Sequence, residues 1–178
     1  VNAKWAATSL VKGNMKMMNG SQLYDFFQQY TNQEAITFNR YNESLRDKNY
    51  DWWKNGSQTG FAQEYNISVA GGSEKMKTYL SAGLYDETGA VKGFDFRRYT
   101  LRYNMNYQVN DWLTLKPKFS AARREADDCQ HSLEAMYTNL PWDSPYDDNG
   151  ELIQQHIPTN WVAQDKSNYL YDLQWNYK

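Results

Sequence analysis

The stretch Arg97–Val109, "RRYTLRYNMNYQV", alternates between two kinds of side chain. From Tyr99 onward every odd position is large and apolar, and every even position is polar. Successive side chains of a β-strand point to opposite faces of the sheet, so the pattern predicts a strand with one apolar and one polar face. Its length of about a dozen residues exceeds the ~5–6 typical of soluble strands. It matches the ~9–11 residues that a tilted strand needs to cross a bilayer.

The composition excludes several classes of protein. Aromatic residues make up 16% of the 178 residues, yet the mean hydropathy is −0.91, so aliphatic core residues are scarce. No apolar run approaches the ~20 residues of a membrane-spanning helix. The charges are interspersed and the formal net charge is −2, which argues against nucleic acid as a partner. With one cysteine, two histidines and no phosphate-binding or nucleophile motif, we expect no cofactor, no metal site, no catalytic residues and no enzyme activity.

Alternation of the same kind recurs along the chain. The further strand candidates are residues 5–11, 62–70, 77–85, 112–121 and 168–177, "NYLYDLQWNY". Short turns at residues 71–75 and 109–112 join some of them, whereas long loops cover about 13–58, 86–96 and 125–166. In an antiparallel meander the short turns then fall at one end and the long loops at the other. That asymmetry is typical of outer-membrane barrels.

Two segments in the long loops are expected to be helical. The segment 19–35 has Ser21 as a candidate N-cap and apolar residues at helical spacing after it. The segment 132–140 is a second candidate, ended by Pro141. The predicted fold class is therefore all-β, an antiparallel meander with long extracellular loops and a short helix.

The segment 60–120 resembles the early barrel region of the SusC/RagA class of TonB-dependent outer-membrane transporters. Its core, "YNISVAGGSEKMKTYLSAGLYDETGAVKGFDFRRYTLR", is similar in order and spacing, and "MMNGSQLYDF", "YTNLPWDSPYDDNGE" and "NYLYDLQWNY" also fit that class. The resemblance implies a barrel of about 22 strands, of which this chain supplies about six. Residues 1–178 are then expected to be a partial barrel domain, with the plug, the TonB-binding segment and the C-terminal strands outside this sequence.

The resemblance also implies a function and partners. The expected function is import of glycans or oligosaccharides across the outer membrane of a Gram-negative bacterium, with peptides as a further substrate class. The expected partners are a SusD-like surface lipoprotein, outer-membrane lipid and, through the absent N-terminal part, TonB. A soluble β-sheet module that binds carbohydrate through surface aromatics is the alternative.

Aromatic and acidic residues gather in the predicted long loops. Flat rings stack on sugar faces beside carboxylates, so the candidate substrate-binding residues are Asp51, Trp52, Trp53, Trp142, Asp143, Tyr146 and Trp161. The competing interpretation is that the tryptophans anchor the loops to one another or lie at the membrane rim. The acidic run "DSPYDDNGE" offers oxygen ligands for calcium, but its spacing is incomplete for an EF-hand. A turn at Asn149 and Gly150 explains it better.

The arginines of the opening strand have two interpretations. Arg97, Arg98 and Arg102 either give a lumen positive charge or pair with carboxylates there, and the pairing is favoured.

Overall fold

The structure, a computed structural model, describes residues 1–29, 43–127, 134–154, 161–163 and 166–175. The chain divides into two compact units. The sheet unit holds residues 1–9 and 59–128, and the loop unit holds residues 10–58 and 129–177. Each unit is described by itself below. No helix among the described residues has the length and apolar character needed to cross a membrane.

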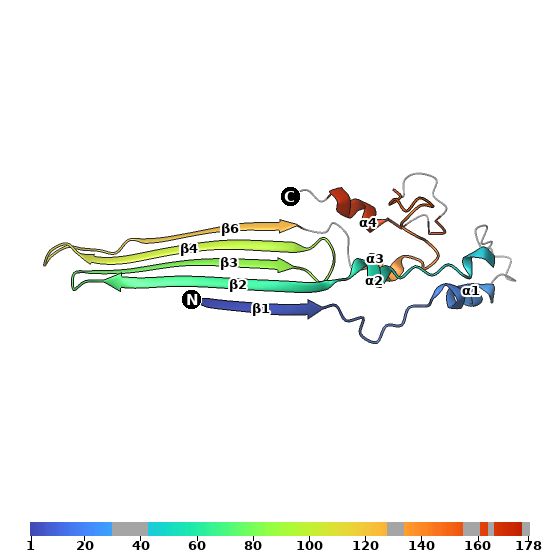
Figure 1. Cartoon of the computed structure of the whole chain (residues 1–178), viewed down its shortest axis with the longest axis horizontal. Helices are drawn as coiled ribbons and strands as arrows, with labels where there is room; N and C mark the ends of the chain where they lie inside the picture. Colours follow the sequence, from blue (N-terminus) through green and yellow to red (C-terminus); the bar gives the residue numbers. More distant parts are fainter. Residues whose placement is uncertain (30–42, 128–133, 155–160, 164–165, 176–178) are drawn as a thin grey trace. The chain divides into compact units, whose positions relative to one another are not determined.

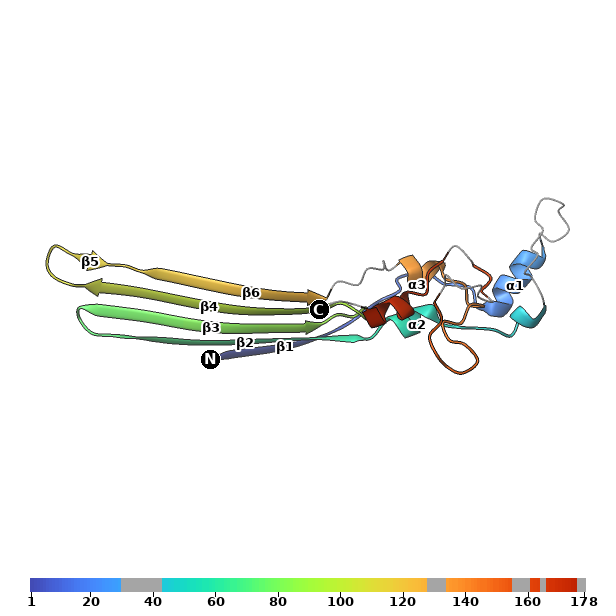
Figure 2. The ribbon, with the colours of Figure 1, turned by 90° about the horizontal axis from the view of Figure 1, so that it is seen from above.

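The sheet unit is one antiparallel sheet of six strands (Figures 1 and 2). Consecutive strands β1 to β4 pair in order, and β4 pairs on its other side with both β5 and β6. The strands are β1 Asn2–Ser9, β2 Thr59–Gly72, β3 Met76–Thr88, β4 Asp95–Gln108, β5 Thr114–Leu115 and β6 Lys118–Asp127. Three of them have 13 or 14 residues, which confirms the predicted all-β meander of long strands.

The register brings the apolar alternate positions of neighbouring strands onto one face. Leu101 lies opposite Ala82 in β3 and opposite Ala121 in β6. Across the sheet this apolar face carries Trp5, Phe61, Tyr65, Ile67, Val69, Leu80, Leu84, Tyr99, Leu101, Tyr103, Met105, Tyr107, Leu115 and Phe119. The other face, here called the polar face, carries Lys4, Glu64, Asn66, Ser68, Lys77, Glu87, Arg98, Thr100, Arg102, Asn104, Lys118, Ser120 and Arg124.

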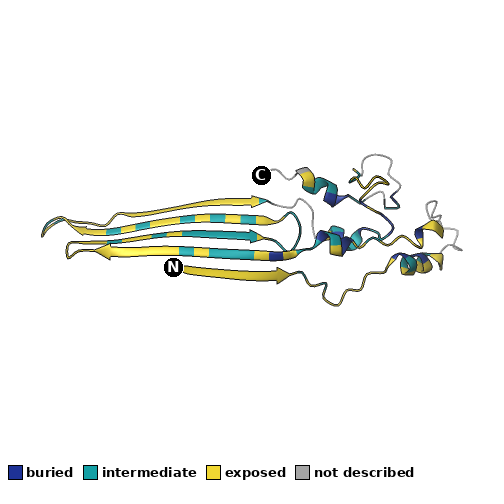
Figure 3. Ribbon diagram, viewed as in Figure 1, coloured by how far each residue is buried: buried dark blue, intermediate teal, exposed yellow. Residues whose placement is uncertain are grey.

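Neither face of this sheet is covered by a hydrophobic core (Figure 3). Ile67 is 51% exposed, and Tyr99 and Leu101 are each 41% exposed. Every buried core residue among the described residues belongs to the loop unit instead. A soluble sheet of this length would bury its apolar face, so exposure on this scale indicates a surface that meets a partner or a membrane.

The two ends of the sheet differ as predicted. At one end β2 and β3 are joined by residues 73–75, and β4 turns back through residues 109–113, where Asn110 Oδ1 accepts hydrogen bonds from two backbone N–H groups. At the other end both long segments leave the sheet, because Ser9 pairs with Thr59 and β6 ends beside the start of β4.

Some predicted boundaries were wrong. The loop expected at 86–96 is only residues 89–94, since Thr88 still pairs with Asp95. Strand β6 runs to Asp127, into the loop expected at 125–166. The strand expected at 112–121 is divided at Pro117, which has no N–H to donate, although its carbonyl still accepts from the N–H of Met105 at 3.0 Å.

The helices all belong to the loop unit. They are α1 Gly20–Gln28, α2 Trp52–Gly56, α3 Glu134–Thr138 and α4 Tyr169–Asp172, with short 3₁₀ turns at Glu43–Leu45 and Leu173–Trp175. Both predicted helices are therefore present, but the N-cap of α1 is Asn19 rather than Ser21. Asn19 forms a capping box with Gln22.

The prediction of a strand over 168–177 was wrong. Its described part is α4 followed by a 3₁₀ turn. Tyr169 and Leu170 are buried there by tertiary packing, which overrides the strand preference of the aromatic residues.

Candidate functional site

The core of the loop unit is built from tryptophans whose indole N–H groups donate to backbone carbonyls. Trp52 donates to Leu140 at 3.0 Å, and Trp142 donates to Gly20 at 3.0 Å. Trp161 donates to Ser144 at 2.6 Å. These acceptors stabilise the core, because an indole N–H buried without one costs about 1–3 kcal/mol. The first two bonds join residues 10–58 to the segment that follows β6.

Aromatic packing adds further connections inside this unit. The Trp52 ring lies 5.5 Å from the Trp161 ring and 5.6 Å from the Tyr169 ring, between centroids. The Tyr169 hydroxyl donates to the Trp52 carbonyl at 3.1 Å. Gly56 is required beside this cluster, since a Cβ there would overlap the Tyr169 hydroxyl and the Met136 methyl group. Three segments of chain thus form one small aromatic core.

Asp143 is a buried carboxylate that fastens one loop to another. It is 2% exposed and accepts hydrogen bonds from the backbone N–H groups of Val162 at 2.6 Å and Ala163 at 3.0 Å. Charge-assisted bonds of this kind offset the cost of removing a carboxylate from water. The structure therefore gives Asp143 a structural role.

These contacts separate the predicted substrate-binding residues into two groups. Trp52, Trp53, Trp142, Asp143 and Trp161 are buried within the loop unit, although Trp142 and Trp161 also line the cavity described below. This favours the interpretation that the tryptophans anchor the loops. Asp51 and Tyr146 are exposed. Asp51 caps α2 by accepting from the Lys54 N–H at 2.9 Å, and it lies 3.9 Å from the Lys12 ammonium.

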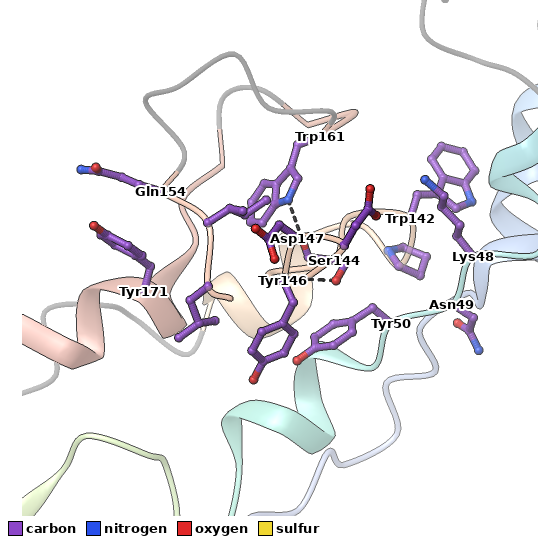
Figure 4. A pocket seen from close by; sticks show the side chains of 14 residues that line it. Lys48, Asn49, Tyr50, Trp142, Ser144, Tyr146, Asp147, Gln154, Trp161 and Tyr171 are labelled. Atoms are coloured by element: carbon purple, nitrogen blue, oxygen red, sulfur yellow. Dashed lines mark hydrogen bonds between the residues drawn. The ribbon is translucent and has the colours of Figure 1, made fainter. Parts of the chain in front are cut away.

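A cavity of about 780 Å³ opens beside this core, within the loop unit (Figure 4). Its wall combines aromatic rings with polar and charged side chains. It is lined by Lys48, Asn49, Tyr50, Pro141, Trp142, Ser144, Tyr146, Asp147, Asp148, Leu152, Ile153, Gln154, Trp161 and Tyr171. The size and the mixed lining are those of a site for a small ligand or for part of a larger one.

Two tyrosines, Tyr50 and Tyr146, lie together on one wall of this cavity (Figure 4). Their ring centroids are 6.3 Å apart in an edge-to-face arrangement. Burial raises the pKa of the Tyr50 hydroxyl, and the neighbouring Tyr146 raises it further. Tyr50 is therefore protonated at physiological pH and presents a neutral hydroxyl.

The cavity has charges of both signs. Lys48 contributes an ammonium group, and Asp147 and Asp148 contribute carboxylates. Backbone N–H groups, that of Glu151 foremost, hold the pKa of the Asp147 carboxyl below its ordinary value. Such a lining can bind a ligand that itself carries both an ammonium and a carboxylate.

Asp147 also explains the acidic run "DSPYDDNGE" as a turn. Its Oδ1 accepts from the N–H groups of Asn149 and Glu151, both at 2.9 Å, and Gly150 has a φ of 83°. Asn149, in the same turn, has no positive φ. Across the ranges described above, no three histidine, cysteine, aspartate or glutamate side chains are grouped for metal binding. Cys129, His131 and His156 lie outside the described residues.

Several lining residues gave no signal in the sequence. Lys48 and Tyr50 are far from Tyr171 in the chain, and neither Lys48 nor Tyr50 belongs to a motif. Only tertiary packing brings them together.

No family model matches the chain. It is 27% identical over 107 residues to TonB-dependent receptor P39 of Formosa agariphila, a match that covers 58% of this chain and 10% of that receptor. Its fold is similar to the structure of the RagAB peptide importer in the 'closed-closed' state, with a TM-score of 0.61 and 25% identity over 86% of this chain. A second RagAB structure, titled a peptide transporter, gives a TM-score of 0.63 and 23% identity.

In sequence and in fold, this chain resembles part of the SusC/RagA-type TonB-dependent receptors. It spans about one fifth of the RagAB chains that it matches and about one tenth of receptor P39. The resemblance noted in the sequence is therefore confirmed. The antiparallel sheet has the fold expected for part of a TonB-dependent receptor barrel.

Proposed function

We propose that this chain forms part of the barrel wall and of the extracellular loops of an outer-membrane importer that takes up peptides. The uncovered apolar face of the long antiparallel sheet carries this proposal, and the likeness to RagAB supports it. In this arrangement the apolar face meets lipid and the polar face meets the lumen. The chain contributes no catalysis; it contributes a wall and binding surfaces.

The dimensions of the apolar face suit a bilayer. The eight steps from Tyr99 to Tyr107 at about 3.4 Å each give about 27 Å along β4. A tilt of about 40° reduces this to about 21 Å, close to the ~25 Å apolar band of outer-membrane barrels. Tyrosine occupies both ends of this stretch, where an aromatic ring spans the boundary between hydrocarbon and water.

The sheet also needs neighbours on both sides. Within the part of the chain that the structure describes, the outer edges of β1 and β6 have no neighbouring strand. Unpaired N–H and C=O groups in lipid cost several kcal/mol each, so further strands must continue the pairing and close a barrel. We therefore propose that the sheet unit is one part of a closed barrel.

The proposed partners and substrate also rest on the likeness to RagAB. A SusD-like lipoprotein would cover the loop side, and TonB would supply energy through parts of the transporter that this sequence does not contain. We favour peptide cargo because the RagAB structures are titled a peptide importer, and because the cavity lining carries charges of both signs. The mixed-charge cavity beside Tyr146, with Asp51 as a separate exposed carboxylate, is the proposed substrate contact in this chain.

An uptake assay tests this proposal. Cells that depend on the full-length transporter would be supplied with a fluorescent oligopeptide mixture or a fluorescent oligosaccharide mixture. We expect peptide uptake, reduced severalfold by Tyr146→Ala and unchanged by Trp112→Ala, which removes a largely exposed ring from the short turn after β4. Oligosaccharide uptake without peptide uptake would overturn the peptide proposal and support the glycan prediction.

The soluble carbohydrate-binding module makes a different prediction. It requires a sheet unit that stays monodisperse without detergent, whereas the exposed apolar face predicts aggregation unless detergent covers it. Size-exclusion chromatography of the chain with and without detergent separates the two. A single monomeric peak in plain buffer would favour the module.

A further inference from the structure

Four basic side chains gather on the polar face of β4 and β6. Arg98 lies directly opposite Arg124, Arg102 lies opposite Ser120, and Lys118 lies opposite Asn104. All four are on the same face because they occupy even positions in one continuous register. We call Arg98, Arg102, Lys118 and Arg124 the basic stripe.

Like charges placed directly opposite each other on neighbouring strands are destabilising. Among the residues that the structure describes, no carboxylate forms an ion pair with any member of the basic stripe. The guanidinium of Arg98 lies over the Tyr85 ring, 5.6 Å from its centroid. The acidic residues nearby have other partners, since Glu64 pairs with Lys4 and Glu87 accepts from the Tyr85 hydroxyl.

On the apolar face of the same strands, by contrast, arginines are paired with carboxylates. There Arg97 forms a two-pronged contact with Asp86 at 2.8 and 3.1 Å, and Arg123 pairs with Glu125 at 2.7 Å. Arginines on the face that would meet lipid are thus neutralised within the chain. Arginines on the lumen face are left for an external anion.

The basic stripe begins near the end of the sheet from which the long segments leave. Arg98 is close to the start of β4, and Arg124 is close to the end of β6. Arg102 lies four residues deeper, about 13 Å along the strand. An extended peptide that runs along β4 would present alternate side chains about 7 Å apart, so acidic residues two or four positions apart match this spacing.

We propose that the basic stripe binds acidic side chains of peptide cargo, so that the transporter favours acidic over neutral peptides. This inference rests on the proposed function, because it requires peptides in the lumen. Guanidinium groups suit the purpose, since their planar fork binds a carboxylate through two parallel hydrogen bonds. A row of positive charge near the opening also raises the local concentration of anionic cargo, and salt weakens the effect.

The experiment compares two fluorescent peptides that differ only by Glu-to-Gln changes at alternate positions. The full-length transporter would be studied as wild type, as the double variant Arg98→Gln/Arg124→Gln and as the control Lys77→Gln. Lys77 lies on the same face near the other end of the sheet. Binding to purified protein and uptake by cells would both be measured at low ionic strength, together with the thermal unfolding temperature.

We expect the wild type and Lys77→Gln to prefer the acidic peptide by about five- to tenfold, the scale of two partly exposed ion pairs. The double variant should lose that preference while it binds the neutral peptide as before. An unchanged preference in the double variant would overturn the inference. The inference would also be overturned if the double variant unfolded at a lower temperature and bound both peptides equally less well. The basic stripe would then pair with an acidic segment of the transporter itself.

The two proposals fail differently. If neither peptide enters wild-type cells but the acidic peptide binds the purified protein and depends on Arg98 and Arg124, peptide import is wrong and the anion site stands. If both peptides enter wild-type cells at equal rates and bind equally, peptide import stands and the anion site is wrong.

Discussion

The substitution Trp142→Phe should loosen the loop unit, because it removes the indole donor that holds α1 to the segment after β6. The change removes the hydrogen bond from the indole to the Gly20 carbonyl, at a cost of about 0.5–1.5 kcal/mol, while that carbonyl keeps its place in the backbone bonding of α1. The smaller ring also leaves roughly 40 Å³ unfilled, which adds about 1 kcal/mol at ~24 cal/mol per Å³. The expected loss of local stability is therefore about 1.5–2.5 kcal/mol.

Hydrogen exchange followed by mass spectrometry on the detergent-solubilised protein measures this loss. Protection of the α1 amides should fall by roughly 10- to 70-fold if they exchange by local opening. Trp53→Phe is the matched control, because Trp53 is also buried but its indole N–H makes no hydrogen bond to another described residue. Its predicted cost is the cavity alone, about 1 kcal/mol. Equal losses in the two variants, or no loss in Trp142→Phe, would refute the assigned role of the indole hydrogen bond.

Three further predictions follow from the structure. Gly56→Ala should cost about 1–3 kcal/mol of loop-unit stability by overpacking, measured by the same exchange experiment, whereas Gly71→Ala, whose Cβ meets nothing within 4 Å, should not. Ile67→Arg on the apolar face should lower the free energy of unfolding, measured by urea titration, by about 2–4 kcal/mol. Ser68→Arg on the polar face should have a much smaller effect, and equal effects would contradict the assigned faces. The pKa of Asp147 is lowered by backbone hydrogen bonds, so its contribution to the turn is complete above the ordinary aspartate pKa and is lost as pH falls through the lowered value. Carboxyl ¹³C NMR with Asp-selective labelling checks this, with Asp147→Asn to identify the signal, and titration at or above the ordinary value would contradict it.

The long strands were predictable from sequence because alternation over many residues fixes both the strand and its faces. The segment around Tyr99 and Leu101 shows this, since every odd position lies on the apolar face as expected. Strand ends were less predictable. Residues 122–127, "ARREAD", do not alternate clearly in hydrophobicity, yet they continue β6 because β4 provides a paired edge for them.

The loop unit was harder to predict because aromatic residues serve two purposes. A tryptophan that stacks on a ligand and a tryptophan that forms a core have the same sequence signature. Trp52 and Trp161 were candidates for substrate contact, and the structure buries both against residues that are distant in the chain. The segment around Tyr169, where a strand was expected, is helical for the same reason. The Tyr169 hydroxyl donates a hydrogen bond to the carbonyl of Trp52, which is distant in the chain. No local pattern carries that information.

The central claim is that the apolar face of β4 meets lipid and the polar face meets water. Single spin labels at successive positions from Tyr99 to Tyr107 test it most directly, in the full-length transporter in lipid bilayers with Cys129 replaced by serine. Collision with dissolved oxygen should be high at the odd positions, and collision with a water-soluble nickel complex should be high at the even positions. Equal accessibility at both sets of positions, or the opposite alternation, would contradict the account.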